Sequence, residues 1–182
     1  PLDPARRARL GVAMATGERL LTAGLVDVRV EPPTTEAARH CIAAYLAEIG
    51  ERFEEGFDPA RTGTAEPDEL TPPAGLLLVA FLDGEPIGCG ALKLHGDEPA
   101  DIKRLWVARS ARGLGVGRRI LTDLEGQARA RGATVVRLDT NRSLHEAQAL
   151  YRSAGYVEVP RFNDEPYAHH WFAKHLAPPP PA

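Results

Sequence analysis

The chain has 182 residues, of which 43% are hydrophobic and 26% are charged, and its formal net charge is −3. These values are typical of one globular domain. They exclude a disordered or collagen-like chain and a protein that binds nucleic acid through overall positive charge. No stretch approaches the roughly 18 consecutive apolar residues that a membrane span needs, and the charged head has no apolar signal-peptide core.

The two cysteines, Cys41 and Cys89, are too few for a disulfide framework, and they form no CxxC pair that could hold zinc. The sequence therefore predicts a reduced, cytoplasmic protein without a metal site. We also expect no contact with a membrane.

The first predicted elements are two helices separated by a strand. Asp3 is an N-cap followed by proline, and apolar residues then recur at helical spacing over residues 4–24. Alternating apolar and polar residues predict a strand over 26–30. Thr34 or Thr35 then caps a second helix that reaches about residue 49.

Residues 56–75 are rich in Pro, Gly and acidic side chains, which predicts a long loop. The rest of the chain alternates strands with helices, beginning with a hairpin turned at Asp83-Gly84. The predicted strands cover residues 76–82, 87–94, 102–107, 134–139, 156–159 and 167–174. The predicted helices cover residues 114–131, ended by Gly132, and about 144–154, capped by Ser143.

This order predicts one α/β domain with a mixed sheet over residues 25–176. A helical extension over residues 1–24 precedes that domain. A proline-rich, disordered tail over residues 177–182 follows it.

A glycine-rich turn (residues 112–117) joins the third strand of this group to the long helix. Gly113, Gly115 and Gly117 remove side chains where the backbone turns, so N–H groups can face one concavity at a helix N-terminus. Six cations and no acidic residue lie between residues 102 and 122. Together these features predict a phosphate or pyrophosphate site. The alternatives are glycines that let the helix pack closely and a solvated basic face.

Three segments resemble motifs of the GNAT acetyltransferase family. Arg112-Gly-Leu-Gly-Val-Gly117 resembles the R/Q-x-x-G-x-G/A motif that cradles the acetyl-CoA pyrophosphate, and residues 101–107 resemble the strand before it. Ala147-Gln-Ala-Leu-Tyr151, followed by Gly155-Tyr156, resembles the family's A-x-x-L-Y-x-x-x-G-F/Y. The resemblance covers about residues 26–176. It implies a mixed, mostly antiparallel twisted sheet flanked by helices, with acetyl-CoA as cosubstrate.

The resemblance also implies how the cosubstrate is held. The backbone of the strand pairs with the pantetheine arm, the turn holds the pyrophosphate, and an arginine lies near the outer phosphates. The residues implied are Leu105, Trp106, Val107, Arg112, Gly113, Leu114, Gly115, Val116, Gly117, Arg118 and Arg119. Relatives often carry Asn where this chain has Leu144. Asn141 could bind pantetheine from a shifted position, or it caps the helix with Ser143.

The family's usual general acid is a tyrosine that protonates the departing thiolate, and Tyr151 matches it. The alternative for Tyr151 is a core tyrosine on the apolar face of its helix. Asp101 matches the carboxylate that serves some members as general base. The alternatives there are a solvated carboxylate at the start of a strand, an ordered water or one of the histidines.

The resemblance places the acceptor pocket around residues 53–70 and 162–171. The first region is acidic, which suits a cationic amine, but it is also typical of a solvated acidic loop. The sequence thus predicts an acetyl-CoA-dependent N-acetyltransferase in which the primary amine of a small molecule attacks the thioester directly. The alternative is a CoA-binding regulatory or sensor domain with little turnover.

The head over residues 1–24 resembles the junction in bacterial proteins that fuse a MarR-like regulator to a GNAT domain. Because the sequence does not begin with Met, we expect the acetyltransferase part of such a fusion. The alternative is an extension that packs on its own domain or on a second copy in a homodimer. No recognition helix is predicted here, so this part should not bind DNA specifically.

Overall fold

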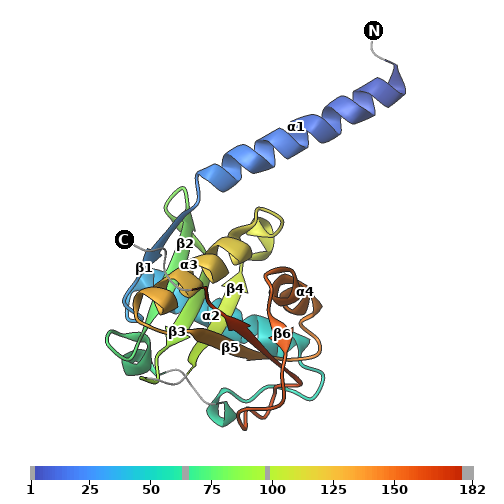
Figure 1. Ribbon diagram of the computed structural model, residues 1–182. Helices are drawn as coiled ribbons and strands as arrows, with labels where there is room; N and C mark the ends of the chain where they lie inside the picture. The colour runs from blue at the N-terminus through green and yellow to red at the C-terminus, as the bar shows by residue number, and fades with distance from the viewer. Residues whose placement is uncertain (1–2, 63–65, 97–98, 178–182) are drawn as a thin grey trace.

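The computed structural model describes residues 3–62, 66–96 and 99–177 (Figure 1). Seven strands form one sheet in the order β1-β2-β3-β4-β5-β7-β6. All neighbouring strands are antiparallel except β4 and β5, which are parallel. The strands are β1 (Asp27–Val30), β2 (Gly75–Leu82), β3 (Glu85–Lys93), β4 (Ala100–Val107), β5 (Val135–Thr140), β6 (Val157–Glu158) and β7 (His170–His175). The predicted mixed, mostly antiparallel α/β fold is confirmed.

The described α-helices are α1 (Pro4–Gly24), α2 (Glu36–Arg52), α3 (Val116–Ala130) and α4 (His145–Ser153). The sheet separates two apolar clusters, because β2 is apolar at nearly every position and alternate side chains point to opposite faces. Leu76, Leu78 and Ala80 pack with α3 on one face, in the cluster that also contains Tyr151 of α4. Leu77 and Val79 pack with α2 on the other face.

Two irregularities open the sheet beside β4. The register between β3 and β4 shifts after Cys89, and Arg104 takes a left-handed backbone conformation with φ +54°. In the described part of the chain, β4 pairs with β5 only at Ala100–Val136 and Asp101–Arg137. The remainder of β4 therefore diverges from β5 and leaves a gap between two neighbouring strands.

The predicted helix over residues 4–24 forms as α1, and its Asp3 cap accepts a hydrogen bond from the N–H of Arg6 at 2.9 Å. Figure 1 shows α1 extending away from the sheet, and none of its residues is buried. Leu21 is 76% exposed. None of the helices in the described ranges is long and apolar enough to span a membrane.

Three sequence-based details are corrected. The loop over residues 56–75 contains short 3-10 helices at Pro59–Arg61 and Pro67–Leu70. Ser143 does not cap α4: its buried hydroxyl has no hydrogen-bond partner, and Leu144 precedes the helix. The last strand begins at His170 rather than at residue 167, because Tyr167 belongs to the preceding loop. The predicted tail lies outside the described residues from residue 178 onward.

Candidate functional site

Two adjoining cavities occupy the gap beside β4. The inner cavity, of about 140 Å³, is lined by Tyr45, Leu46, Ile49, Phe53, Phe57, Pro59, Thr62, residues 102–105, residues 139–141, Leu144, Ala147, Tyr151, Glu165, Tyr167 and Ala168. The outer cavity, of about 540 Å³, is lined by Tyr45, Glu48, Ile49, Arg52, residues 105–107, Ala111, Arg112, Gly113, residues 115–118, Leu144, Glu146, Ala147 and Leu150. Tyr45, Ile49, Leu105, Leu144 and Ala147 line both. The two cavities therefore form one cleft that runs from the glycine-rich turn to the loops beyond α2.

The glycine-rich turn presents free backbone donors to the outer cavity. Gly113 and Gly115 have φ values of +85° and +79°, and a Cβ at either would meet no atom within 4 Å. The first turn of α3 follows, where N–H groups lack intrahelical acceptors. Within the described residues, no acceptor pairs with the N–H groups of Gly113, Gly115, Val116, Gly117 or Arg118. Unpaired donors at a helix N-terminus fit the oxygens of a diphosphate.

The arginines of this segment do not all reach the cavity. Arg112 and Arg118 line it, and the guanidinium of Arg118 contacts the Ser153 carbonyl at 3.4 Å. Arg119 instead donates to the carbonyl oxygen of Val26 and does not line either cavity. Successive helix residues point about 100° apart, so Arg118 and Arg119 cannot serve the same site. Of these two arginines, only Arg118 lines the outer cavity.

Leu114 was expected to contribute its backbone N–H, and its side chain packs against the core without lining the outer cavity. Its N–H donates weakly to the carbonyl of Ala111, at 3.4 Å. The strand residues Leu105, Trp106 and Val107 line the outer cavity as the resemblance implied. The Val107 carbonyl accepts a hydrogen bond from Nε of Arg112 at 3.1 Å.

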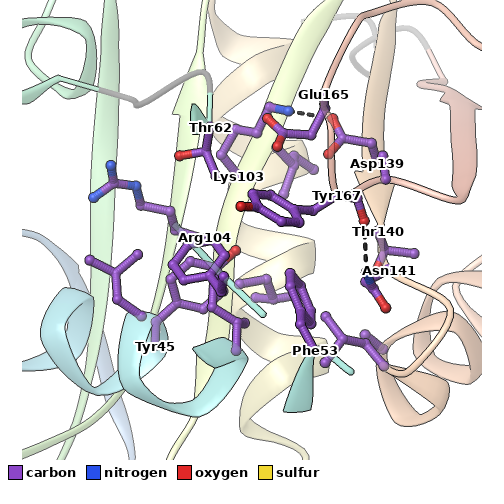
Figure 2. Close-up of a pocket in the computed structure, with 18 of the residues that line it drawn as sticks. Tyr45, Phe53, Thr62, Lys103, Arg104, Asp139, Thr140, Asn141, Glu165 and Tyr167 are labelled. Carbon is purple, nitrogen blue, oxygen red and sulfur yellow. Dashed lines mark hydrogen bonds and ion pairs between the residues drawn. The ribbon is translucent and has the colours of Figure 1, made fainter. Parts of the chain in front are cut away.

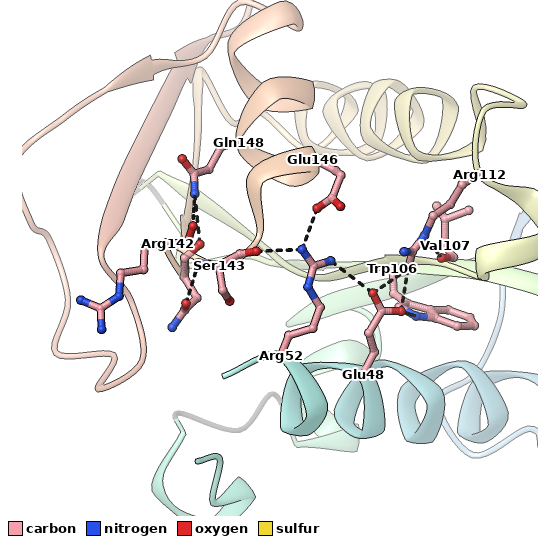
Figure 3. A network of polar contacts seen from close by, with 10 residues as sticks. Glu48, Arg52, Trp106, Val107, Arg112, Arg142, Ser143, Glu146 and Gln148 are labelled. Atoms are coloured by element: carbon pink, nitrogen blue, oxygen red, sulfur yellow. Dashed lines mark hydrogen bonds and ion pairs between the residues drawn. The ribbon is translucent and has the colours of Figure 1, made fainter. Parts of the chain in front are cut away.

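Glu48 of α2 connects Arg112 of the glycine-rich turn with Trp106 of β4 at the outer cavity (Figure 3). Its carboxylate accepts hydrogen bonds from Arg112 at 2.6 Å and from the Trp106 indole at 3.0 Å. Burial raises the pKa of Glu48, but hydrogen bonds from Arg112 and Trp106 outweigh it and hold the pKa below its usual value. Glu48 is therefore a half-buried anion that fixes Arg112 beside the turn.

The same network continues to α4 through Arg52. Its guanidinium contacts Glu48 at 3.4 Å, the Ser143 carbonyl at 2.7 Å and the Glu146 carboxylate at 2.7 Å. Figure 3 shows these contacts as a row between α2 and α4. No local sequence pattern marks Glu48 or Arg52 as part of a site, because apart from each other their partners lie 58–94 residues away along the chain.

Two tyrosines, Tyr151 and the half-buried Tyr45, line the inner cavity. Tyr151 is 5% exposed, and its ring centroid lies 5.9 Å from those of Tyr156 and Phe172. Burial raises the pKa of Tyr151 and of Tyr45 far above the ordinary phenol value, so both keep their protons at neutral pH. Tyr45 lines both cavities, although its place in the helical spacing of the second predicted helix is that of an ordinary core residue.

Asp101 and Asn141 have other partners than expected. Asp101 forms ion pairs with Arg137 at 2.5 Å and with His95 at 3.1 Å, and it lines neither cavity. The carboxylates that do line the inner cavity are Asp139 and Glu165.

Asn141 lines the inner cavity, but its side chain shapes the turn before α4. The amide nitrogen donates to the Tyr167 carbonyl at 2.8 Å, and the amide oxygen accepts from the N–H of Ser143 at 2.9 Å. These contacts fit the alternative in which Asn141 helps to cap α4, and they leave the amide less available to bind pantetheine. The Ser143 hydroxyl takes no part in them.

An aromatic wall, formed by Phe53, Phe57 and Tyr167, closes the inner cavity opposite β4. Its ring centroids are 5.2–5.7 Å apart. The two segments expected to form the acceptor pocket therefore meet here. Figure 2 shows Tyr167 within the cavity and Lys103, Asp139 and Glu165 together at its polar end. Lys103 donates to Asp139 there.

The acidic loop supplies little of this lining. Glu54 and Glu55 border a third hollow, which adjoins the inner cavity at Phe53, Asn141 and Tyr167, and Glu55 pairs with Arg142 at 2.7 Å. Glu69 pairs with Lys93 at 2.8 Å. In the described ranges, no cluster of His, Cys, Asp and Glu could hold a metal ion.

Comparison with known proteins places the chain in a family. The model of the "Acetyltransferase (GNAT) family" matches residues 42–156. An "IAA acetyltransferase" of Azospirillum brasilense is 36% identical over 90 residues, which are 49% of this chain and 59% of that protein. The match thus spans less than two thirds of that relative's length. An uncharacterized N-acetyltransferase of Schizosaccharomyces pombe is 33% identical over 141 residues, which are 76% of this chain and 82% of that protein.

Solved structures share the fold. The putative acyl-CoA N-acyltransferase of Klebsiella pneumoniae is 26% identical, with a TM-score of 0.68 over 84% of this chain and 99% of that chain. A GNAT family acetyltransferase of Elizabethkingia anophelis with acetyl-CoA bound is 19% identical, with a TM-score of 0.60 over the same shares.

Proposed function

Because this chain belongs to the GNAT acetyltransferase family, we propose that it is an N-acetyltransferase that acetylates the primary amine of a small molecule with acetyl-CoA. The observation that carries the proposal is the cleft beside β4. It has unpaired N–H donors at one end and, at the other, a small cavity with an aromatic wall and a polar end.

The residues fit the parts of acetyl-CoA in order along the cleft. The N–H groups of the glycine-rich turn and Arg118 hold the diphosphate. The diverging edge of β4 at residues 105–107 lies beside the pantetheine arm, with Leu144 and Ala147 opposite. We do not assign a pantetheine contact to the side chain of Asn141, because it is occupied in the turn before α4.

The chemistry takes place where the two cavities adjoin. Acetyl-CoA supplies an activated acetyl group as its thioester. The amine nitrogen bonds to the acetyl carbon, the carbon–sulfur bond breaks, and the phenol of Tyr151 donates its proton to the departing thiolate. The apolar lining excludes water, which would otherwise compete with the amine.

The amine must lose a proton to become the product amide. Asp101 is occupied by Arg137 and His95 outside the cleft, so we do not assign it this role. We assign proton acceptance to the polar end of the inner cavity, at Glu165 or through a water held there, because Asp139 is paired with Lys103.

The test measures acetyl-CoA binding and turnover separately. Acetyl-CoA should raise the melting temperature of the purified chain, and CoA release should depend on an added amine. Absence of thermal protection would refute the cosubstrate assignment. Protection by acetyl-CoA without turnover of any amine would favour the regulatory alternative, and the full-length gene would then be examined for an upstream winged-helix domain.

A further inference from the structure

We propose that the acceptor is a small monoamine with an aromatic or branched apolar body, and not a polycation. This inference rests on the proposed function and adds the substrate class. It follows from the aromatic wall, the size of the inner cavity and the balance of charge within it.

The aromatic wall is held in place before any ligand arrives. Phe53 ends α2, and Phe57 follows it in the loop, with their rings edge to face at 85°. The Tyr167 hydroxyl accepts a hydrogen bond from the N–H of Asp58 at 2.8 Å, which ties the two loops together. A preformed aromatic surface favours an apolar or aromatic body, because little order is lost on binding.

The inner cavity has the size of one small group. Its volume is about 140 Å³. An apolar protein cavity of about 150 Å³ holds a single benzene ring. A ring or branched chain therefore fills the inner cavity, while the attached amino group reaches the acetyl group at the boundary marked by Tyr45 and Leu105.

Charge within the inner cavity is balanced. Its lining includes two cations, Lys103 and Arg104, and two anions, Asp139 and Glu165. Asp139 already accepts hydrogen bonds from Lys103 and from the Asn163 amide, the latter at 2.8 Å. A polyamine or aminoglycoside would bring several ammonium groups that need unpaired carboxylates. Glu54 and Glu55 of the acidic loop line the adjoining hollow but not the inner cavity itself, and Glu55 is already paired with Arg142 at 2.7 Å.

The experiment compares amines on the wild-type enzyme with acetyl-CoA. Benzylamine, isoamylamine, ethylamine, spermidine and kanamycin are assayed for acetylation, and their binding to the enzyme–CoA complex is measured by calorimetry. We expect kcat/KM for benzylamine to exceed that for spermidine by about 10- to 100-fold, the range that burial of one ring supports.

A variant locates the effect in the aromatic wall. Phe57→Ala should lower kcat/KM and affinity for benzylamine by about 10- to 100-fold and change ethylamine turnover by less than about threefold. Phe162→Ala is the matched control, because that ring lies under Arg137 and lines neither cavity. Melting curves of both variants confirm that they fold.

The outcomes separate this inference from the proposed function. Preference for spermidine or kanamycin, or equal loss for ethylamine and benzylamine in Phe57→Ala, overturns the substrate class and leaves acetyl transfer intact. Binding of benzylamine without acetylation supports the substrate class and overturns the proposed function. If no amine binds and none is acetylated, both are wrong.

Discussion

Replacing Gly115 by Glu tests the assignment of the glycine-rich turn to a diphosphate. The new side chain would point into open space at the outer cavity, because a Cβ there meets no atom within 4 Å. Its carboxylate would lie among the N–H groups that we assign to phosphate oxygens. Two like charges roughly 4 Å apart repel by about 4 kcal/mol at an effective dielectric constant of ~20, which corresponds to about 10³-fold in affinity.

The substitution also strains the backbone, since Gly115 has φ +79°. A residue with a side chain loses about 1–2 kcal/mol in that conformation. Gly132→Glu is the matched control, because Gly132 has φ +89°, an equally open Cβ position, and lies past the other end of α3. Gly115→Ala carries the strain without the charge.

The assay is calorimetric titration with acetyl-CoA, with melting curves to report folding. We expect Gly115→Glu to weaken acetyl-CoA binding by at least about 100-fold, Gly115→Ala to weaken it much less, and Gly132→Glu to bind like the wild type. Wild-type affinity in Gly115→Glu, or an equal loss in Gly132→Glu, would refute the diphosphate assignment.

Other substitutions test single groups of the site. Tyr151→Phe should lower kcat by about 10²–10⁴-fold with little change in the KM for acetyl-CoA. Tyr156 is a buried neighbour outside both cavities, so Tyr156→Phe should leave kcat nearly unchanged in the same steady-state assay. Glu48→Gln should lower the free energy of unfolding by about 1–3 kcal/mol at neutral pH. Despite burial, hydrogen bonds from Arg112 hold the pKa of Glu48 below its unfolded value of about 4.3, so this stabilisation is complete above that pH and is lost as the pH falls further. Denaturant unfolding over a pH series should therefore show wild type and variant converging in acid. Asp101→Asn should lower the melting temperature by breaking the pair with Arg137 but change kcat by less than about threefold; a fall in kcat of about 10²-fold or more would restore Asp101 as the base.

Features that depend on neighbouring residues were readable from the sequence. The glycine-rich turn has its own signal, because left-handed glycines and a helix N-terminus are encoded within residues 112–117. The Asp3 and Thr35 caps and the hairpin at Asp83-Gly84 were equally local. Element order then gave the mixed sheet.

Contacts between distant segments were not readable. Glu48 and Arg112 are 64 residues apart, and no local pattern marks either as the partner of the other. Tyr45 has the helical spacing of a core residue. It lines a cavity because β4 diverges from β5 and leaves a gap there, and no local pattern in the sequence shows that gap. Arg118 and Arg119 are equivalent in sequence but separated by the rotation of the helix. Ser143 has the residue type of a cap without its geometry.

The short pairing of β4 with β5 divides the sheet into two halves. β1–β4 form one ladder and β5, β7 and β6 the other, so few backbone hydrogen bonds cross between them. Such a seam can part at a lower free energy than that of global unfolding. A ligand in the cleft contacts both halves and is lost when they part, so it raises the free energy of that partial opening in proportion to the logarithm of its concentration. Bound cosubstrate therefore stabilises the contact between the two halves of the sheet. The backbone amides of β5 and β7 should exchange hydrogen with solvent more slowly as the cosubstrate concentration rises.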